Sequence, residues 1–284
     1  MILDYVVFRR LNRVKHAFFI WSGEVKNNDF FHMCLKSLQN ISNCKISVYT
    51  PKLDTGTTLL KSMGINVVKF DRTEWDNRRQ VCKVEKIREH LYSLNEDDHM
   101  MVFDGDMFMV SDPFEVFEKD FDFFYTSREH PIFPANGGCL GFRCNDKSKE
   151  FLDIFVENLN EPNWDPYVEL RKNHPDSPGL EYKDWWVDQD FLNCIHKYKN
   201  EINDGLLDID LKVYDAKNKY NYIIIGKSDE EIFDGIEKNE ISVLHFKATS
   251  MTRWINDSVG DRMGDRLDRL NEIIRKRKVE QYGS

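Results

Sequence analysis

Short apolar runs alternate with amphipathic stretches through the first 110 residues, and this order constrains the fold more than any other feature. Runs typical of buried strands lie at 16–22, 45–50, 65–70 and 100–103. Between them, apolar residues recur at the three- and four-residue spacing of a helix, most clearly over 79–94. Alternating strands and helices predict an α/β fold with a mixed, mostly parallel central sheet flanked by helices. Ligands of such sheets bind at the carboxyl ends of the strands.

The second half of the chain is less regular. A segment rich in Pro and Gly, 161–179, predicts a loop or lid. We find no internal repeat and predict a single domain over 1–284, with a nucleotide-binding half (1–110), an acceptor and sugar half (111–260) and a basic C-terminal helix (261–284). Further strands are predicted at 121–125, 138–143, 222–225 and 241–245, and further helices at 148–159, 185–198 and 261–280.

The charge balance and the cysteines exclude several classes of function. Forty basic residues against 49 acidic ones give a net charge of −9, which disfavours nucleic-acid binding because phosphate neutralisation needs clustered Lys and Arg. The six cysteines form no C-x-x-C pair and predict reduced thiols. Neither a signal peptide nor an apolar run of about 18 residues is evident. We therefore expect a soluble, cytoplasmic protein.

The motif Asp104-Gly105-Asp106 directly follows the apolar run 100–103. Two carboxylates at the end of a buried strand repel each other unless something neutralises them. A divalent cation does so in many proteins, because Mg²⁺ and Mn²⁺ prefer carboxylate oxygens and bridge to substrate phosphates. The alternative is a polar turn between two strands. We predict that Asp104 and Asp106 bind Mn²⁺ or Mg²⁺.

Five segments together resemble one known family. Asp104-Gly105-Asp106, followed by Asp112-Pro113-Phe114, resembles the D-x-D region of GT-A nucleotide-sugar glycosyltransferases, and most of all glycosyltransferase family 8, the glycogenin and lipopolysaccharide galactosyltransferase group. The five segments keep the order of that family over about residues 16 to 255. The other four are Lys86 in the preceding helix, the N-x-G strand Asn136-Gly137-Gly138, the D-Q-x-x-L-N helix at Asp188-Gln189, and the V-x-H-F motif Val243-Leu244-His245-Phe246.

This resemblance implies a function as well as the GT-A fold. It implies a metal-dependent, retaining glycosyltransferase that moves a sugar from a nucleoside-diphosphate donor, by default a UDP-sugar. The acceptor would be a glycan, a glycoprotein or a lipid-linked molecule. His245 would complete the coordination of the metal, although a lone histidine is more often a hydrogen-bonded core residue. Asp188 and Gln189 would lie beside the reacting sugar as the catalytic pair, with a simple helix cap as the alternative for Asp188.

The remaining candidate residues would bind the donor. Ser22 and Gly23 end the first strand, where α/β sheets meet nucleotides. Each candidate also has a structural alternative, either a solvated charge or a plain turn. The segment after His245 departs from the glycine and Lys-Pro-Trp of the family. The other donor-binding candidates are Arg79 and Lys86 on one side of a helix, Asn136, Gly137 and Gly138 at a strand, and Lys247 and Arg253 after the V-x-H-F motif.

Two other functions stay open from the sequence. One is a phosphohydrolase with Asp104 as its nucleophile, although Phe108 occupies the position where that class has Thr or Val. The other is a non-catalytic nucleotide-sugar binding module. Release of nucleoside diphosphate would indicate the transferase, and release of inorganic phosphate would indicate the phosphohydrolase. The binding module would release neither.

The C-terminal helix is basic and amphipathic. Its apolar stripe predicts either packing on the domain, the more common role, or a weak contact with an anionic membrane surface. Interspersed acidic residues weaken its positive field, so any membrane contact would be sensitive to salt. Its basic residues are Arg262, Arg266, Arg269, Arg275, Lys276, Arg277 and Lys278, and its apolar ones are Met263, Leu267, Leu270, Ile273 and Ile274.

Overall fold

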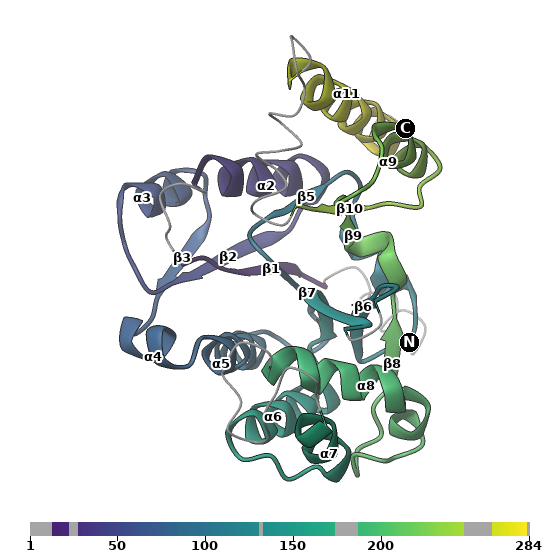
Figure 1. The fold of residues 1–284 in the computed structure, drawn as a ribbon. Coiled ribbons are helices and arrows are strands. Elements are labelled where there is room, and N and C mark those ends of the chain that lie inside the picture. The colour runs from purple at the N-terminus through teal and green to yellow at the C-terminus, as the bar shows by residue number, and fades with distance from the viewer. Residues whose placement is uncertain (1–12, 23–27, 131–132, 174–186, 247–262, 283–284) are drawn as a thin grey trace, which may run out of the picture.

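The computed structural model describes residues 13–22, 28–130, 133–173, 187–246 and 263–282. A seven-stranded sheet forms the centre of the molecule (Figure 1). In spatial order its strands are β3 (Asn66–Lys69), β2 (Lys45–Thr50), β1 (Lys15–Ile20), β4 (His99–Phe103), β7 (Ala135–Arg143), β6 (Phe123–Ser127) and β8 (Val213–Asp215). Only β7 runs antiparallel to its neighbours in this sheet, which confirms the predicted mixed, mostly parallel sheet.

Helices cover both faces of the sheet, and each face has its own apolar core (Figure 1). Because side chains alternate along a strand, Phe18 lies in one core while Ala17 and Phe19 lie in the other. One face carries α2 (Asn28–Ile41) and α3 (Thr55–Ser62). The opposite face carries α4 (Arg72–Asn77), α5 (Arg79–Tyr92), α6 (Asp146–Asn160), α7 (Asp165–Asn173) and α8 (Val187–Asn203).

A second sheet of three strands joins distant parts of the chain. Its order is β5 (Met107–Met109), β10 (Val243–His245) and β9 (Tyr222–Ile223), with β5 and β10 antiparallel. The register pairs His245 with Met107, so a histidine late in the chain lies beside the Asp-Gly-Asp motif. Two 3₁₀ helices, η2 (Pro113–Glu118) and η3 (Lys217–Tyr220), complete the connections to these strands.

The C-terminal helix α11 (Met263–Tyr282) packs on the domain next to α9 (Asp229–Glu237) (Figure 1). Leu270 and Ile274 are buried in the core that also contains α2. The guanidinium of Arg269 lies 4.0 Å from the ring centre of Phe233, and Arg277 donates to the carbonyl of Val110 at 3.0 Å. The apolar residues Leu270, Ile273 and Ile274 of α11 therefore pack on the domain. Within the described ranges, no helix combines the length and the apolar character that a membrane crossing needs.

The structure corrects one predicted element. The Pro- and Gly-rich segment 161–179 predicts a loop, but α7 occupies residues 165–173. Pro166 lies in the first turn of this helix, where its missing N–H costs no intrahelical hydrogen bond. Tyr167 and Arg171, one turn apart, are both buried, and α7 packs against α8. The sequence also gives no strong signal for the short elements α4, α9, β5 and β8. The division of the chain at 110 and 260 stays a prediction.

Candidate functional site

Asp104, Asp106 and His245 form a cluster with the geometry of a metal site. One ligand atom from each residue lies within 4.8 Å of the others. Asp104 follows β4 and Asp106 precedes β5, whereas His245 ends β10. The backbone N–H of Phe246 donates to the carbonyl of Asp106 at 2.9 Å, and Nε2 of His245 lies 3.3 Å from Oδ1 of Asp106. Two carboxylates and an imidazole suit Mn²⁺ or Mg²⁺, so these residues fit the predicted metal.

A chain of hydrogen bonds holds His245 in place. Nδ1 of His245 lies 2.7 Å from Oδ1 of Asn221, and the amide nitrogen of Asn221 donates to Oγ1 of Thr126 at 2.8 Å. The hydroxyl of Thr126 donates to the carbonyl of Asn136 at 3.2 Å. The amide oxygen of Asn221 accepts a hydrogen bond from Nδ1, so Nε2 is the ring nitrogen that lies toward Asp106. Such outer partners fix the orientation of a ligating histidine.

Lys83 is a cation of the site that the sequence analysis missed. Its Nζ lies 3.1 Å from Oδ1 of Asp104 and 3.4 Å from the carbonyl oxygen of Gly137. Burial of this side chain lowers the pKa of Lys83, but Asp104 and Asp188 outweigh that effect and the pKa is raised. Lys83 therefore stays charged beside the cluster of Asp104, Asp106 and His245.

The predicted cation Lys86 points elsewhere. Its Nζ lies 2.6 Å from Glu89 and 3.8 Å from Glu74, and it does not line the cavity described below. Arg79 does line that cavity, and its guanidinium lies 5.3 Å from the centre of the Trp75 ring. The two cations of α5 that line the cavity are therefore Arg79 and Lys83, four residues apart, and not the predicted pair Arg79 and Lys86.

Asp188 and Gln189 lie in the first turn of α8, against β7. Oδ1 of Asp188 accepts a hydrogen bond from the N–H of Gln189 at 2.8 Å. Burial raises the pKa of Asp188 to about 6; Lys83 opposes this shift and Asp104 adds to it. The side chain of Gln189 accepts from the N–H of Gly137 and donates to the carbonyl of Ala135, so it ties α8 to β7.

The glycines of β7 let its backbone approach the cluster of Asp104, Asp106 and His245. A Cβ on Gly138 would lie 2.8 Å from Cε of Met107 and 2.9 Å from Oδ2 of Asp104. The N–H of Asp104 donates to the carbonyl of Gly138 at 2.8 Å, and Oδ1 of Asn136 accepts from the N–H of Gly138 at 2.9 Å. A side chain at 138 would therefore displace Met107 and Asp104, and the three residues predicted from the N-x-G motif lie at the site.

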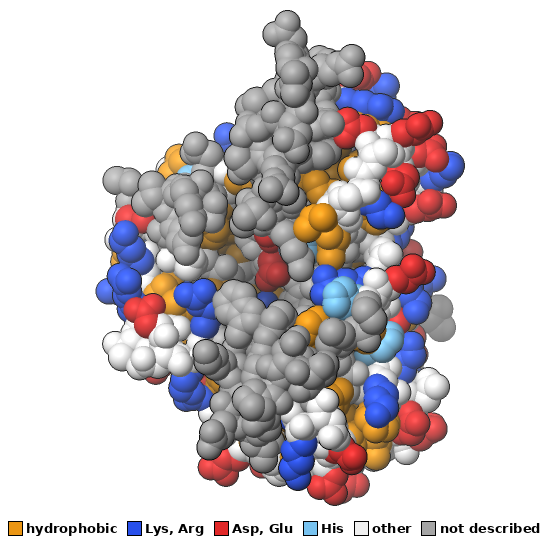
Figure 2. Space-filling view, in the orientation of Figure 1, with side chains coloured by type: hydrophobic (Ala, Val, Ile, Leu, Met, Phe, Trp, Pro, Cys, Tyr) orange, Lys and Arg blue, Asp and Glu red, His pale blue; other side chains and the backbone are white. Residues whose placement is uncertain are grey.

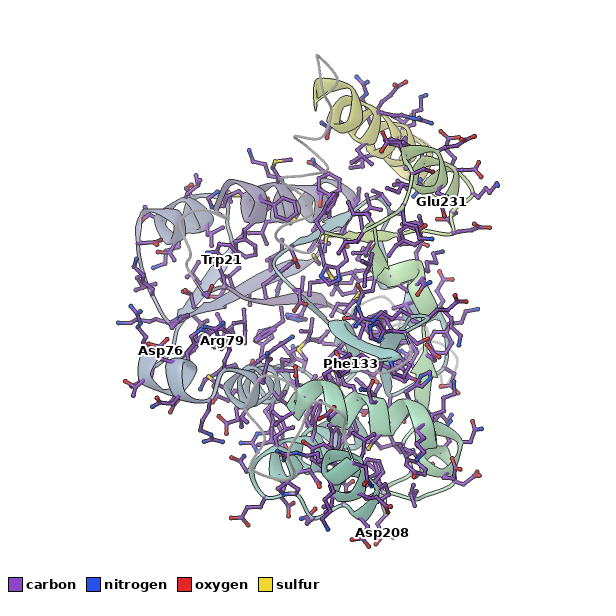
Figure 3. All side chains as sticks on the ribbon, viewed as in Figure 1. Trp21, Asp76, Arg79, Phe133, Asp208 and Glu231 are labelled. Atoms are coloured by element: carbon purple, nitrogen blue, oxygen red, sulfur yellow. The ribbon has the colours of Figure 1, made fainter. Side chains whose placement is uncertain are left out.

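One cavity of about 500 Å³ collects these groups. Figure 2 shows acidic side chains near the centre of this face, with basic and histidine side chains beside them. In Figure 3, Arg79 lies toward α4 and Phe133 lies beside β7. The cavity is lined by Phe18, Ile20, Trp75, Arg79, Gln80, Lys83, Val102, Phe103, Asp104, Asp106, Arg128, Asn136, Gly137, Gly138, Asp188, Gln189 and His245.

Lys86 and Ser22 are the predicted donor-binding residues that the structure describes away from the cavity lining. Ser22 follows β1 but is not among the described residues that line the cavity. Gly23, Lys247 and Arg253 lie outside the described residues.

Comparison with known proteins places the fold. No family model matches the chain, and no curated protein matches it either. The structure resembles the glycosyltransferase GlyE of Streptococcus pneumoniae TIGR4 at 14% identity, with a TM-score of 0.53, over 93% of this chain and 63% of that one. The chain thus spans less than two thirds of GlyE.

The galactosyltransferase LgtC is similar over nearly its whole length. An active-site mutant of LgtC aligns at 12% identity, with a TM-score of 0.53, over 91% of this chain and 94% of that one. LgtC in complex with donor and acceptor sugar analogs aligns at 12% identity, with a TM-score of 0.50, over 92% of this chain and 95% of that one. These similarities confirm the predicted GT-A fold.

Proposed function

We propose that this protein is a metal-dependent glycosyltransferase that uses a nucleoside-diphosphate sugar, by default a UDP-sugar. The convergence of Asp104, Asp106 and His245 at the end of β4, in a fold shared with glycosyltransferases, carries this proposal. The acceptor is a glycan, a glycoprotein or a lipid-linked molecule. The protein acts in the cytoplasm.

The residues of the cavity divide the chemistry among them. Asp104, Asp106 and His245 hold Mn²⁺ or Mg²⁺, which when bound neutralises charge on the leaving diphosphate. Lys83 adds a fixed positive charge beside it and can donate hydrogen bonds to phosphate oxygens. Arg79 lies at the same wall of the cavity and serves the same anion.

The sugar lies against Asp188, Gln189 and β7. With a pKa of about 6, Asp188 is ionised at neutral pH and can stabilise positive charge at the anomeric carbon. Gln189 is anchored on the backbone of β7 and fixes the start of α8. Asn136, near the start of β7, contacts the sugar. By resemblance to family 8, the transfer retains the anomeric configuration.

Calorimetry of UDP binding tests this function. We expect UDP to bind tightly with Mn²⁺ and weakly in EDTA, and we expect Asp106→Ala to remove the metal effect. Asp76→Ala, which removes an exposed carboxylate on α4, is the matched control. Equal UDP affinity with and without metal would contradict the proposal.

A product assay with a panel of nucleotide sugars separates the alternatives. The transferase releases nucleoside diphosphate, and the phosphohydrolase with Asp104 as nucleophile releases inorganic phosphate. A binding module retains the donor and releases neither product.

Any contact between α11 and a membrane would be electrostatic. Its apolar residues Leu270 and Ile274 are buried on the domain, so they cannot enter a lipid bilayer while α11 stays packed. We propose that any contact with an anionic membrane uses exposed cations such as Arg275 and Lys276 and is weak.

A further inference from the structure

Arg128 is a cation of the cavity that none of the steps above uses. It directly follows β6 and lines the cavity with its side chain half-buried. Its Nε donates to the carbonyl of Phe133 at 3.1 Å, and its backbone N–H donates to the carbonyl of Pro134 at 2.8 Å. These bonds fix the base of the side chain and leave the terminal nitrogens of the guanidinium for another partner.

No acidic residue neutralises Arg128 in the described part of the chain. Lys83 pairs with Asp104, and Arg79 lies over the Trp75 ring. Burial alone lowers the pKa of Arg128, and no carboxylate among the described residues opposes that effect. A partly desolvated charge without a counter-ion costs free energy, and this cost is recovered when an anion binds. The guanidinium also matches carboxylates and phosphates geometrically, because it can donate two parallel hydrogen bonds.

The position of Arg128 in the sheet indicates which substrate carries the anion. The order β1-β4-β7-β6 puts Arg128 two strands beyond Asp104, roughly 10 Å across the sheet at the usual strand spacing. Trp75 and Arg79 line the cavity together with Phe18 and Ile20 of β1, on the other side of β4. In Figure 3, Arg79 lies to the left of Phe133, and the carbonyl of Phe133 is the hydrogen-bond partner of Arg128.

With the diphosphate at Asp104 and the sugar at Asp188 and Asn136, Arg128 lies beyond the transferred sugar. The group that reaches it belongs to the molecule that receives the sugar. We propose that Arg128 binds a carboxylate or phosphate of the acceptor, so that the enzyme prefers an acidic saccharide. This inference rests on the proposed function, which supplies the direction from donor to acceptor.

A glycan array with matched pairs tests the inference. Each pair differs by one sialic acid, uronic acid or phosphate group, and the protein is applied with UDP and Mn²⁺ and also without them. We expect the wild type to retain the acidic members preferentially. Arg128→Gln should reduce this preference about tenfold or more, as the loss of a charge-assisted hydrogen bond does. Arg128→Lys should keep part of it.

Arg88→Gln is the matched control, since it removes the same charge from a guanidinium that pairs with Asp153 outside the cavity. Equal retention of acidic and neutral members by the wild type overturns the inference. An equal loss of preference in Arg88→Gln also overturns it, because the preference would then come from overall charge.

Calorimetry of UDP separates this inference from the proposed function. A tenfold loss of UDP affinity in Arg128→Gln would assign the guanidinium to the donor and overturn the inference. If UDP does not bind the wild type at any metal concentration, while the acidic preference is present and depends on Arg128, the proposed function fails and the anion site stands.

Discussion

Asp188→Asn should make the protein more stable at neutral pH and much less active. The change removes a buried charge and keeps both the shape of the side chain and an oxygen that can accept from the N–H of Gln189. Burial is the main cause of the raised pKa of Asp188, and Lys83 compensates only part of it. The wild-type chain therefore ionises this carboxyl at a cost, which Asn does not have.

The raised pKa sets the size of the effect and its pH dependence. The pKa moves from 3.8 to about 6, and each unit corresponds to about 1.36 kcal/mol, so the cost at pH 7.5 is about 3 kcal/mol. Between these two pKa values the folded state of the wild type holds more protons than the unfolded state, so its stability falls as the pH rises through this window. Near pH 4.5 the difference between variant and wild type should shrink to about 1 kcal/mol.

Urea unfolding in EDTA at pH 4.5 and pH 7.5 measures both values. Asp76→Asn, at an exposed carboxylate of α4, should leave the stability nearly unchanged at either pH. In the product assay, Asp188→Asn should lower kcat far more than it weakens donor binding. If the variant is less stable than the wild type at pH 7.5, attraction by Lys83 outweighs desolvation and the reasoning is wrong. If kcat stays within about threefold of wild type, Asp188 only caps the helix.

Two further substitutions and one binding experiment probe the site and the C-terminal helix. Asn221→Ala removes the acceptor for His245 and should weaken the Mn²⁺ dependence of UDP affinity about 10- to 100-fold, and an unchanged dependence would exclude this orienting role. Gly138→Ala should displace Met107 and Asp104 and lower metal affinity, measured by Mn²⁺ titration, with Gly64→Ala as a control without close contacts but with a positive φ. In vesicle sedimentation we expect at most weak binding to anionic vesicles, lost at physiological salt; binding to neutral vesicles would show that apolar residues of α11 reach lipid.

The sequence predicts the parallel part of the sheet well, because each strand there is an apolar run separated from the next by a helix. The reversal at β7 could not be predicted, since a strand buried on both faces has the same apolar composition in either direction. The helix α7 was missed for a different reason. Its burial depends on contact with α8, which no local pattern in a polar, Pro-containing segment reveals.

The candidate site shows the same division. The Asp-Gly-Asp motif could be predicted because charge at the end of an apolar run is a local signal. The sequence could not show which of Lys83 and Lys86 lies at the site, because both follow Arg79 at a spacing that places them on the same helix face. Glu74 and Glu89 decide it by pairing with Lys86. The role of Asn221 depends on the pairing of β9 with β10 and has no signal in the sequence.

The charges around Lys83 predict that a divalent cation and a diphosphate would bind together. Three carboxylates, those of Asp104, Asp188 and Asp106, raise the pKa of this one ammonium group. Without a metal, Lys83 and these three carboxylates together carry an excess of two negative charges, which would repel a diphosphate placed beside them. A divalent cation at Asp104, Asp106 and His245 would cancel that excess, so a diphosphate would then meet a neutral group of charges with two positive centres. By linkage, a bound diphosphate must raise the affinity for the metal by the same factor by which a bound metal raises the affinity for the diphosphate.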